Sequence, residues 1–388
     1  MHACDPREVG IDPERLARLA TVIRGDIDAQ RYDGCELVVG RHGRVFFHDA
    51  LGWADRVAKR RVEPDQLFVS MSVGKQLTVA LVLGRIERGD FALTTRVADM
   101  IPAFADRGKG NVTVAHLLTH TGGLPMMLPP IPLELVGNLD ALVEATCKTI
   151  LESRPGQRVV YSVVVAHAVL ADLVRRADGN RRPFRQILAE DLFTPLGMRH
   201  TSLGIRDDLR PRLAPVVVRD RRPGFLDPDF LEAMGSFLGA EAEVPAGGYV
   251  STAPDLWRFA EMLRRGGELD GARILSPAMV DAVQVVRTGT EPNTLWDYTQ
   301  ATRGWDPFPA NLGLGFFVRG EGLHPSPFGT LASPRTFGGF GAGSTVFWID
   351  PARDLSYAFM SSGLMEESYS LERHQRLADL VHTAVVGP

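Results

Sequence analysis

Apolar and polar residues alternate with two different periods along this chain. Near the start, leucines recur at helical spacing from about Asp12 to Asp28, with Asp12 placed to cap a helix and Pro13 at its first position. Two short apolar segments follow, Cys35–Gly40 and Val45–Asp49, separated by a polar turn. The beginning of the chain therefore predicts a helix followed by a β-hairpin.

A matching pattern lies near the other end of the chain. Ser344–Ile349 and Leu355–Ser361 have the composition of two strands joined by a turn at Asp350-Pro351, and a last helix is expected over roughly Ser370 to Val386. Because a hairpin flanked by a helix occurs at each end, we expect the two ends to share one sheet.

Helical periodicity dominates the middle of the chain, where five segments predict helices: Val73–Arg88, Val114–His120, Asp140–Leu151, Val163–Ala177 and Arg185–Leu192. Long irregular stretches, which in compact chains are usually lids or pocket walls, are Pro125–Pro132, Val216–Pro245 and Arg287–Pro334. The predicted organisation is an α/β domain in two parts, residues 1–100 and 241–388, with a mostly helical lobe, residues 101–240, inserted between them.

Composition narrows the class of protein. The 388 residues are 45% hydrophobic and 23% charged, as in globular chains, and a net charge of −4 offers no general attraction to nucleic acid or anionic lipid. Met1–Arg7 lacks the features of a secretory signal, and the most apolar stretch, Val159–Val174, is interrupted by polar residues and too short to span a bilayer. We therefore expect a cytoplasmic protein with no nucleic-acid partner and no membrane span.

The sharpest chemical signal is the S-x-x-K sequence Ser72-Val73-Gly74-Lys75 in a chain with only four lysines. On a helix these two side chains lie one turn apart on the same face. A serine hydroxyl becomes a good nucleophile when a neighbouring base removes its proton, and a lysine is such a base when burial keeps it neutral. The alternative is that Ser72 caps the helix and Lys75 lies at the surface.

Two further segments carry candidate chemistry. Tyr161 is a candidate proton shuttle if the charge of the lysine lowers its pKa, and otherwise a buried aromatic residue with a satisfied hydroxyl. The glycine-rich segment Phe337–Ser344 would let another backbone or a ligand approach closely. One interpretation is that a backbone N–H in this segment stabilises an oxyanion. The alternative is that the glycines only allow a tight bend in a sheet.

Other motifs contribute less. His116 and His120 are spaced to share a metal ion, but no third ligand is evident, so packing or helix capping is expected and no metal or other cofactor is predicted. An aromatic cluster is expected to pack in the core, with some members lining an acyl pocket: Trp296, Tyr298, Trp305, Phe308, Phe316 and Phe317.

Taken in order along the chain, six segments resemble the serine β-lactamase-like superfamily of penicillin-recognising enzymes, above all the class C-related esterases called family VIII. These segments are Phe68–Lys75, Val112–Leu124, Pro155–Ser162, Phe193–Met198, Pro245–Thr252 and the glycine-rich strand before Asp350-Pro351. The resemblance implies an antiparallel sheet flanked by helices, with a helical lobe inserted and a pocket between the two. It also implies that Ser72 is the acyl-forming nucleophile, Lys75 its base and Tyr161 the proton shuttle.

Two departures from that family bear on the substrate. Val163 stands where the second motif often has an asparagine that clamps a substrate amide. The third motif has no basic residue; aligned as Phe337-Gly338-Gly339, it gives Gly338, Gly339 and Phe340 substrate-binding positions and makes the Phe340 N–H the oxyanion donor beside that of Ser72. A shift to Gly339-Phe340-Gly341 makes Ala342 that donor. Without a cation, a β-lactam or peptide carboxylate is disfavoured and an uncharged ester or thioester is favoured.

The sequence thus predicts a serine hydrolase of the carboxylesterase type that cleaves a small-molecule ester or thioester through an acyl-enzyme on Ser72. An acyltransferase, such as a transesterase or macrocyclising biosynthetic enzyme, would use the same residues. A β-lactamase or D-peptidase ranks third, and a catalytically silent binding protein is the non-enzymatic alternative. The oligomeric state is left open.

Overall fold

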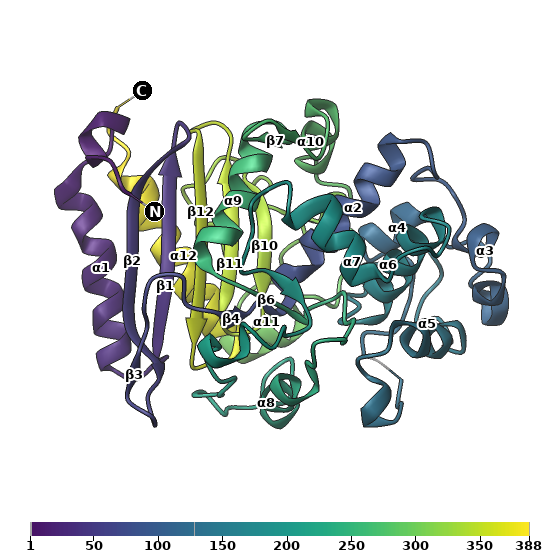
Figure 1. Ribbon diagram of the computed structural model, residues 1–388. Coiled ribbons are helices and arrows are strands. Elements are labelled where there is room, and N and C mark those ends of the chain that lie inside the picture. The colour runs from purple at the N-terminus through teal and green to yellow at the C-terminus, as the bar shows by residue number, and fades with distance from the viewer. Residues whose placement is uncertain (1, 128, 388) are drawn as a thin grey trace.

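The computed structural model describes residues 2–127 and 129–387. Its centre is a seven-stranded antiparallel sheet with the strand order β3-β2-β1-β12-β11-β10-β9 (Figure 1). In that order the strands are Arg60–Arg61, Arg44–Asp55, Gly34–Arg41, Leu355–Ser362, Thr345–Asp350, Phe337–Gly341 and Phe317–Val318. Two smaller sheets are formed by β4 (Phe68–Val69), β6 (Tyr249–Ser251) and β5 (Ser202–Leu203), and by β7 (Glu268–Leu269) and β8 (Ala272–Arg273).

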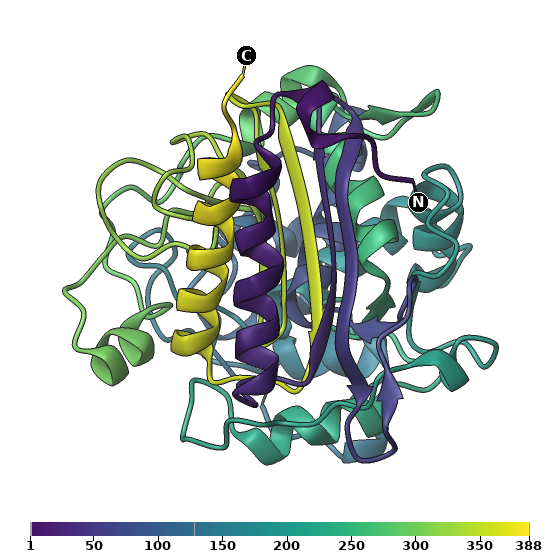
Figure 2. The ribbon, with the colours of Figure 1, turned by 90° about the vertical axis from the view of Figure 1, so that its left-hand side faces the viewer.

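The two ends of the chain meet in the middle of the large sheet. Strand β1 pairs with β12 along its whole length, from Gly34 opposite Ser362 to Arg41 opposite Leu355. Helix α1 (Pro13–Asp28) and helix α12 (Glu367–Ala384) lie side by side on one face of this sheet (Figure 2). The predicted sharing of one sheet by both termini is confirmed.

Alternating side chains of the central strands enter two different cores. In β12, Phe359 packs with the apolar side chains of α1 and α12, whereas Ala358 and Met360 pack on the opposite face. That second face is covered by α9 (Ala253–Arg264), whose Phe259 contacts Phe347 of β11 edge to face, with ring centroids 5.5 Å apart. Burial on both faces explains why Val346–Ile349 of β11 and Tyr357–Met360 of β12 are runs of successive apolar residues rather than alternating ones.

The remaining helices lie between strands β3 and β9 in sequence. They are α2 (Gly74–Glu87), α3 (Val97–Met100), α4 (Val114–Leu118), α5 (Leu139–Cys147), α6 (Val165–Ala177), α7 (Phe184–Leu188), α8 (Pro228–Phe237), α10 (Pro277–Val283) and α11 (Asp297–Arg303). The five helices predicted in the middle of the chain are present, each within a few residues of its expected bounds. The stretch Val216–Pro245, expected to be irregular, contains α8, and Arg287–Pro334 contains α11 and β9.

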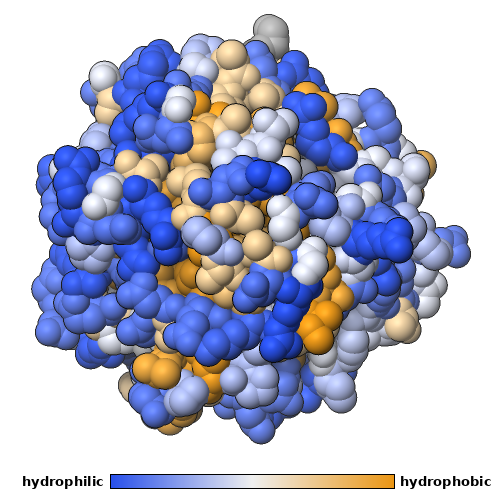
Figure 3. All heavy atoms as spheres, turned by 90° about the vertical axis from the view of Figure 1, so that its right-hand side faces the viewer, coloured by the Kyte–Doolittle hydropathy of each residue, from blue (hydrophilic) through white to orange (hydrophobic). Residues whose placement is uncertain are grey.

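Helices α3, α4, α5, α6 and α7 gather at one end of the molecule, beside α2 and away from α1 and α12 (Figure 1). The architecture is therefore the predicted mixed α/β fold, a large antiparallel sheet flanked by helices. Seen from the helical end, the surface is mostly hydrophilic, with a band of apolar atoms running across its middle (Figure 3). Among the described residues, no helix is both long and apolar enough to cross a bilayer.

Candidate active site

Ser72 lies in a single 3-10 turn, Met71–Val73, directly before helix α2. Met71, the residue before it, has a φ of 51°, a left-handed conformation that side chains other than glycine rarely adopt. The turn is held in place from both sides: the Ser70 N–H donates to the Tyr249 carbonyl at 2.9 Å, and the Thr345 hydroxyl donates to the Ser70 carbonyl at 2.7 Å. Strand β11 and strand β6 thereby fix the position of Ser72.

Glycines allow the surrounding backbone to approach this turn. A Cβ atom on Gly74 would collide with the ring of Tyr249, and one on Gly341 would lie 3.0 Å from the Ser70 carbonyl oxygen. The Tyr249 hydroxyl in turn hydrogen-bonds Thr78 on α2 at 2.6 Å. Glycine at position 74 of the S-x-x-K motif is therefore needed for α2 to pack against β6.

Lys75 is buried, with 2% of its surface exposed, and its ammonium nitrogen points at the hydroxyl of Ser72. Nζ lies 3.0 Å from Ser72 Oγ, 2.8 Å from the Val163 carbonyl oxygen and 3.0 Å from the Ala246 carbonyl oxygen. The alternative of a surface lysine is wrong. The cap residue of α2 is Val73, with no side-chain bond, so Ser72 does not serve as its N-cap.

Burial lowers the pKa of Lys75 to about 7. Its three polar neighbours are neutral oxygens, so nothing nearby compensates for the desolvation of an ammonium group. A neutral amine has two N–H donors and one lone pair. With the two N–H groups directed at the carbonyls of Val163 and Ala246, the lone pair is left for the proton of the Ser72 hydroxyl.

Tyr161 completes the group around Ser72. Its hydroxyl hydrogen-bonds Ser72, and its ring centroid lies 5.2 Å from Lys75 Nζ. The expected lowering of its pKa is wrong: burial raises the pKa of Tyr161 to about 12, and the hydrogen bond to Ser72 only partly offsets this. Tyr161 is therefore a phenol at neutral pH, a proton donor rather than a phenolate base.

Neither of the two histidines spaced to share a metal ion is placed as a metal ligand. His116 accepts the Thr113 N–H through Nδ1 in a capping box, and His120 Nδ1 accepts the Ser162 N–H at 3.0 Å. The His120 ring packs on that of Tyr161 at 4.5 Å, and burial lowers its pKa to about 3. Within residues 2–127 and 129–387, no group of three or more possible protein ligands surrounds a metal position.

Only the last residues of the glycine-rich segment Phe337–Ser344 lie close to Ser72. Phe340 and Ala342 line cavities next to Ser72. Gly338 and Gly339 lie further back in β10, where an added Cβ would meet Phe347 and Trp348, or Phe347 and Gln76. Of the residues predicted to bind substrate in this strand, the structure therefore brings Phe340, together with Ala342 of the shifted register, beside the nucleophile.

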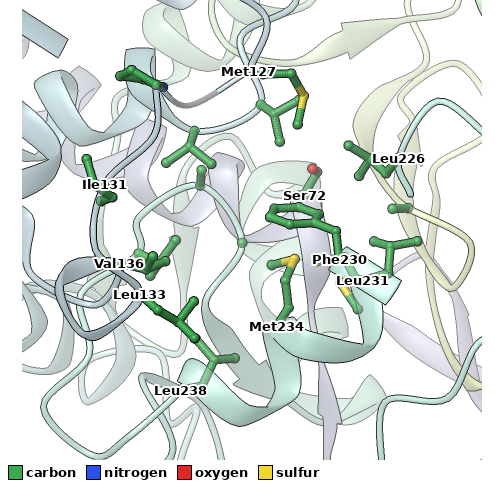
Figure 4. A pocket seen from close by; sticks show the side chains of 18 of the residues that line it. Ser72, Met127, Ile131, Leu133, Val136, Leu226, Phe230, Leu231, Met234 and Leu238 are labelled. Carbon is green, nitrogen blue, oxygen red and sulfur yellow. The ribbon is translucent and has the colours of Figure 1, made fainter. Parts of the chain in front are cut away.

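A cavity of about 270 Å³ opens from Ser72 toward helix α8 and the segment that carries Met127, Ile131 and Val136 (Figure 4). We call it the large cavity. Apart from Ser72, its walls are apolar side chains and backbone of Met71, Met127, Pro129, Pro130, Ile131, Leu133, Val136, Val163, Val164, Leu226, Phe230, Leu231, Met234, Leu238, Val244, Ala246, Gly247 and Ala342. Pro125–Pro132 and Val216–Pro245, predicted to form pocket walls, supply many of these residues; residue 128 lies outside the described part of the chain.

A second cavity of about 50 Å³, the small cavity, also includes Ser72. Its other lining residues are Tyr161, Val163, Phe225, Leu226, Leu295, Trp296, Thr299, Phe317, Phe340, Ala342 and Glu367. The third predicted wall segment, Arg287–Pro334, contributes here. Trp296 and Phe317 from the aromatic cluster line this cavity rather than the large one, with ring centroids 6.0 Å apart.

Sequence reasoning missed several groups that surround Ser72. The carbonyls of Val163 and Ala246 hold Lys75, and a carbonyl has no side-chain signature; the only signal was the position of Val163 two residues after Tyr161. Glu367, at the start of α12, is a carboxyl group on the wall of the small cavity. It lies 206 positions after Tyr161 in the chain, and only the fold brings the two together.

Comparisons with known proteins show the family and the fold of this chain. The family model described as Beta-lactamase matches residues 19–382. Over 217 residues the chain is 33% identical to Esterase EstB of Burkholderia gladioli; the match covers 50% of this chain and 53% of EstB, about half of that relative's length. A penicillin-binding protein homologue from Caulobacter crescentus superposes with a TM-score of 0.80 at 25% identity, over 97% of this chain and 99% of that one.

A family VIII carboxylesterase superposes with a TM-score of 0.78 at 20% identity, over 99% of both chains, which shows a common fold. The chain belongs to the Beta-lactamase family. The predicted resemblance is confirmed, and so is the predicted class, a serine hydrolase enzyme of the β-lactamase-like superfamily.

Proposed function

We propose that the protein is a carboxylesterase that passes through an acyl-enzyme on Ser72. The observation that carries this proposal is the contact between a buried Lys75 nitrogen and Ser72 Oγ, 3.0 Å apart, at the mouth of an apolar cavity. A pKa of about 7 leaves a large share of Lys75 neutral at physiological pH, as a general base requires.

In the first step, neutral Lys75 takes the hydroxyl proton of Ser72 while Oγ forms a bond to the acyl carbon of the ester. The carbonyl electrons move to the carbonyl oxygen. This oxyanion is stabilised by the backbone N–H groups of Ser72 and Ala342. We take the shifted register of the third motif because Ala342 borders both cavities at Ser72, whereas Phe340, the donor in the other register, borders only the small one.

In the second step, the bond between the acyl carbon and the ester oxygen breaks, and the leaving oxygen takes a proton from the Tyr161 phenol. Tyr161 is reprotonated by the Lys75 ammonium, so the lysine is neutral again. Water then attacks the acyl carbon while neutral Lys75 takes one of its protons. The bond between the acyl carbon and Ser72 Oγ breaks, and the Lys75 ammonium gives the proton to Oγ as the acid is released.

The large cavity supports an acyl group made of hydrocarbon. Its volume of about 270 Å³ is slightly below the range of roughly 300–1,000 Å³ that holds drug-sized ligands. Burial of one methylene contributes about 0.8 kcal/mol, so each added carbon raises kcat/KM by up to about fourfold until the cavity is full. An apolar acyl chain of short to medium length is the substrate class that fits.

Acyl transfer is the second candidate, because the small cavity gives an acceptor alcohol a place beside Tyr161 that is separate from the acyl chain. A β-lactamase or D-peptidase activity is disfavoured. Val163 offers an apolar side chain at the position of the amide clamp, and the small cavity contains the carboxyl group of Glu367 where a substrate carboxylate would need a cation.

The test is hydrolysis of p-nitrophenyl esters from acetate to decanoate by wild type, Ser72→Ala and Ser236→Ala. Ser236 is an exposed serine on α8 and serves as the matched control. We expect kcat/KM to rise from acetate to hexanoate and then to level or fall, with Ser236→Ala close to wild type and Ser72→Ala inactive. Turnover by Ser72→Ala at the wild-type rate would overturn the proposal.

A further inference from the structure

Glu367 is a buried carboxyl group on the wall of the small cavity. Only 7% of the residue is exposed. Its Oε2 atom accepts the Phe225 N–H at 3.2 Å, whereas Oε1 has no hydrogen-bond partner among the described residues. Burying a carboxylate oxygen without a hydrogen-bond partner costs free energy. Because Glu367 borders a cavity, its free Oε1 atom points to a ligand in that cavity that would pair with it.

The surroundings of Glu367 do not neutralise its charge. Burial raises the pKa of Glu367 to about 7, and the nearby carboxylate of Glu366 raises it further, while backbone N–H groups at Phe225 and Leu226 act in the opposite direction. Glu366, rather than Glu367, caps helix α12 by accepting the N–H groups of Ser368 and Tyr369. Helix capping therefore does not explain the presence of a carboxyl group at position 367.

The small cavity is the side of Ser72 from which the leaving group departs. Tyr161, the proton donor of the proposed mechanism, lines the small cavity and is not part of the large one. The oxygen that receives its proton belongs to the alcohol, so the alcohol portion lies in the small cavity and the acyl chain in the large one. Glu367 consequently faces the alcohol.

We propose that Glu367 selects an alcohol that carries a protonated amine and rejects one that carries a carboxylate. This inference rests on the proposed esterase function and deepens it. The free Oε1 atom accepts a charge-assisted N–H bond, and the aromatic rings of Trp296, Phe317 and Phe340 on the same walls provide faces that attract a cation. The same selection applies to an acceptor alcohol in acyl transfer.

A purely structural role for Glu367 is the competing explanation. Its Oε2 atom holds the backbone at Phe225, and Phe225 and Leu226 line the small cavity. A loosened loop would change kcat/KM for alcohols of the same shape by similar factors, whatever their charge. The ratio between two esters of equal shape and different charge therefore separates recognition from loop support.

The experiment compares 2-(dimethylamino)ethyl butyrate with its uncharged isostere 3-methylbutyl butyrate, and adds carboxymethyl butyrate as the anionic ester. Wild type, Glu367→Gln and Glu372→Gln are assayed at pH 8. Glu372 is on the same helix, pairs with Arg303 at 2.8 Å and is exposed, so it is the matched control. For wild type and Glu372→Gln we expect the cationic ester to exceed its isostere in kcat/KM by at least about tenfold.

In Glu367→Gln we expect that ratio to fall to about one and the relative rate of the anionic ester to rise, consistent with loss of a charged acceptor. An unchanged ratio in a variant that still turns over 3-methylbutyl butyrate overturns the inference and leaves the esterase function intact. Failure of wild type to cleave any ester, with no acyl group on Ser72, overturns the esterase function and this inference together.

Discussion

Lys75 and Lys109 are two buried lysines in a chain with four, and their surroundings are alike in several respects. Each ammonium nitrogen donates to two backbone carbonyls: Lys75 to Val163 and Ala246, and Lys109 to Asp106 and Thr149, both at 2.7 Å. An aromatic ring lies near each nitrogen, and burial lowers both pKa values.

Two differences separate the two sites. Lys75 has a third partner, the hydroxyl of Ser72, which borders a cavity, and the ring beside it, that of Tyr161, carries a hydroxyl. The ring near Lys109 is that of Phe104, at 5.7 Å. Two backbone carbonyls are thus sufficient to hold a buried lysine such as Lys109. Lys75 is suited to catalysis because a serine on a cavity wall and the phenol of Tyr161 lie beside it.

The largest expected effect is the loss of catalytic rate when the side-chain nitrogen of Lys75 is removed. We expect Lys75→Met to lower kcat for p-nitrophenyl butyrate by about 10³–10⁴-fold, because a general base is lost. Lys109→Met, the matched control, is expected to retain activity within about threefold, since it lines none of the cavities at Ser72. Equal losses in the two variants would show that Lys75 acts through folding alone.

The next effect concerns the ring beside the lysine. Tyr161→Phe makes the surroundings of Lys75 resemble those of Lys109. We expect kcat for an alkyl ester, whose leaving oxygen needs a proton, to fall by about 10²-fold. The loss should be smaller for p-nitrophenyl butyrate, which leaves as a stable anion. Equal losses with both esters would contradict the role of Tyr161 as proton donor to the leaving group.

The pH dependence of kcat/KM tests whether Lys75 is the general base. Because the pKa of Lys75 is lowered to about 7 and its neutral form is the active one, kcat/KM should rise with pH and level off above the pKa. At pH 6 the rate should be about tenfold below its plateau. A pH profile measured with an uncharged ester tests this, and a rate that falls between pH 6 and pH 8 would contradict it.

The smallest effect is on stability at the second lysine. Lys109→Met removes the side-chain donor of the Thr149 carbonyl and one of the two donors of the Asp106 carbonyl, which keeps the backbone N–H of residue 109. We therefore expect the free energy of unfolding to fall by about 1–3 kcal/mol. Chemical denaturation measures this. A variant as stable as wild type would mean that Lys109 is not needed to satisfy those two carbonyls.

Much of the fold was predictable from local pattern. Asp12 and Pro13 defined the start of α1, and the apolar segments at both ends defined β1, β2, β11 and β12, because a helix cap and a short apolar run bounded by turns are both visible in neighbouring residues. Helix α8 was missed although Asp227 caps it and Pro228 occupies its first position. It is short and lies within a loop-like stretch, and its role as a cavity wall depends on contacts far along the chain.

The site was predictable where side chains carry the chemistry and unpredictable where the backbone does. Ser72 and Lys75 were candidates from their residue types and spacing, and the family resemblance implied the role of Tyr161; the structure brings the three together. The predicted direction of the Tyr161 pKa shift was wrong because burial, which raises the pKa, outweighs the hydrogen bond to Ser72, which lowers it. Two features could not be predicted: the proximity of Ala342 to Ser72 and the proximity of Glu367 to Ser72. Both depend on how β10 and α12 pack against the turn that carries Ser72.

The most direct test of the central claim is to trap the covalent intermediate. Wild type and Ser72→Ala are mixed with p-nitrophenyl butyrate, quenched early, and measured by intact mass followed by peptide mapping. The account predicts a burst of nitrophenolate and one butyryl group on the peptide that contains Ser72 in wild type, and neither in Ser72→Ala. A butyryl group on another residue, or turnover by wild type with the same adduct in Ser72→Ala, would contradict it.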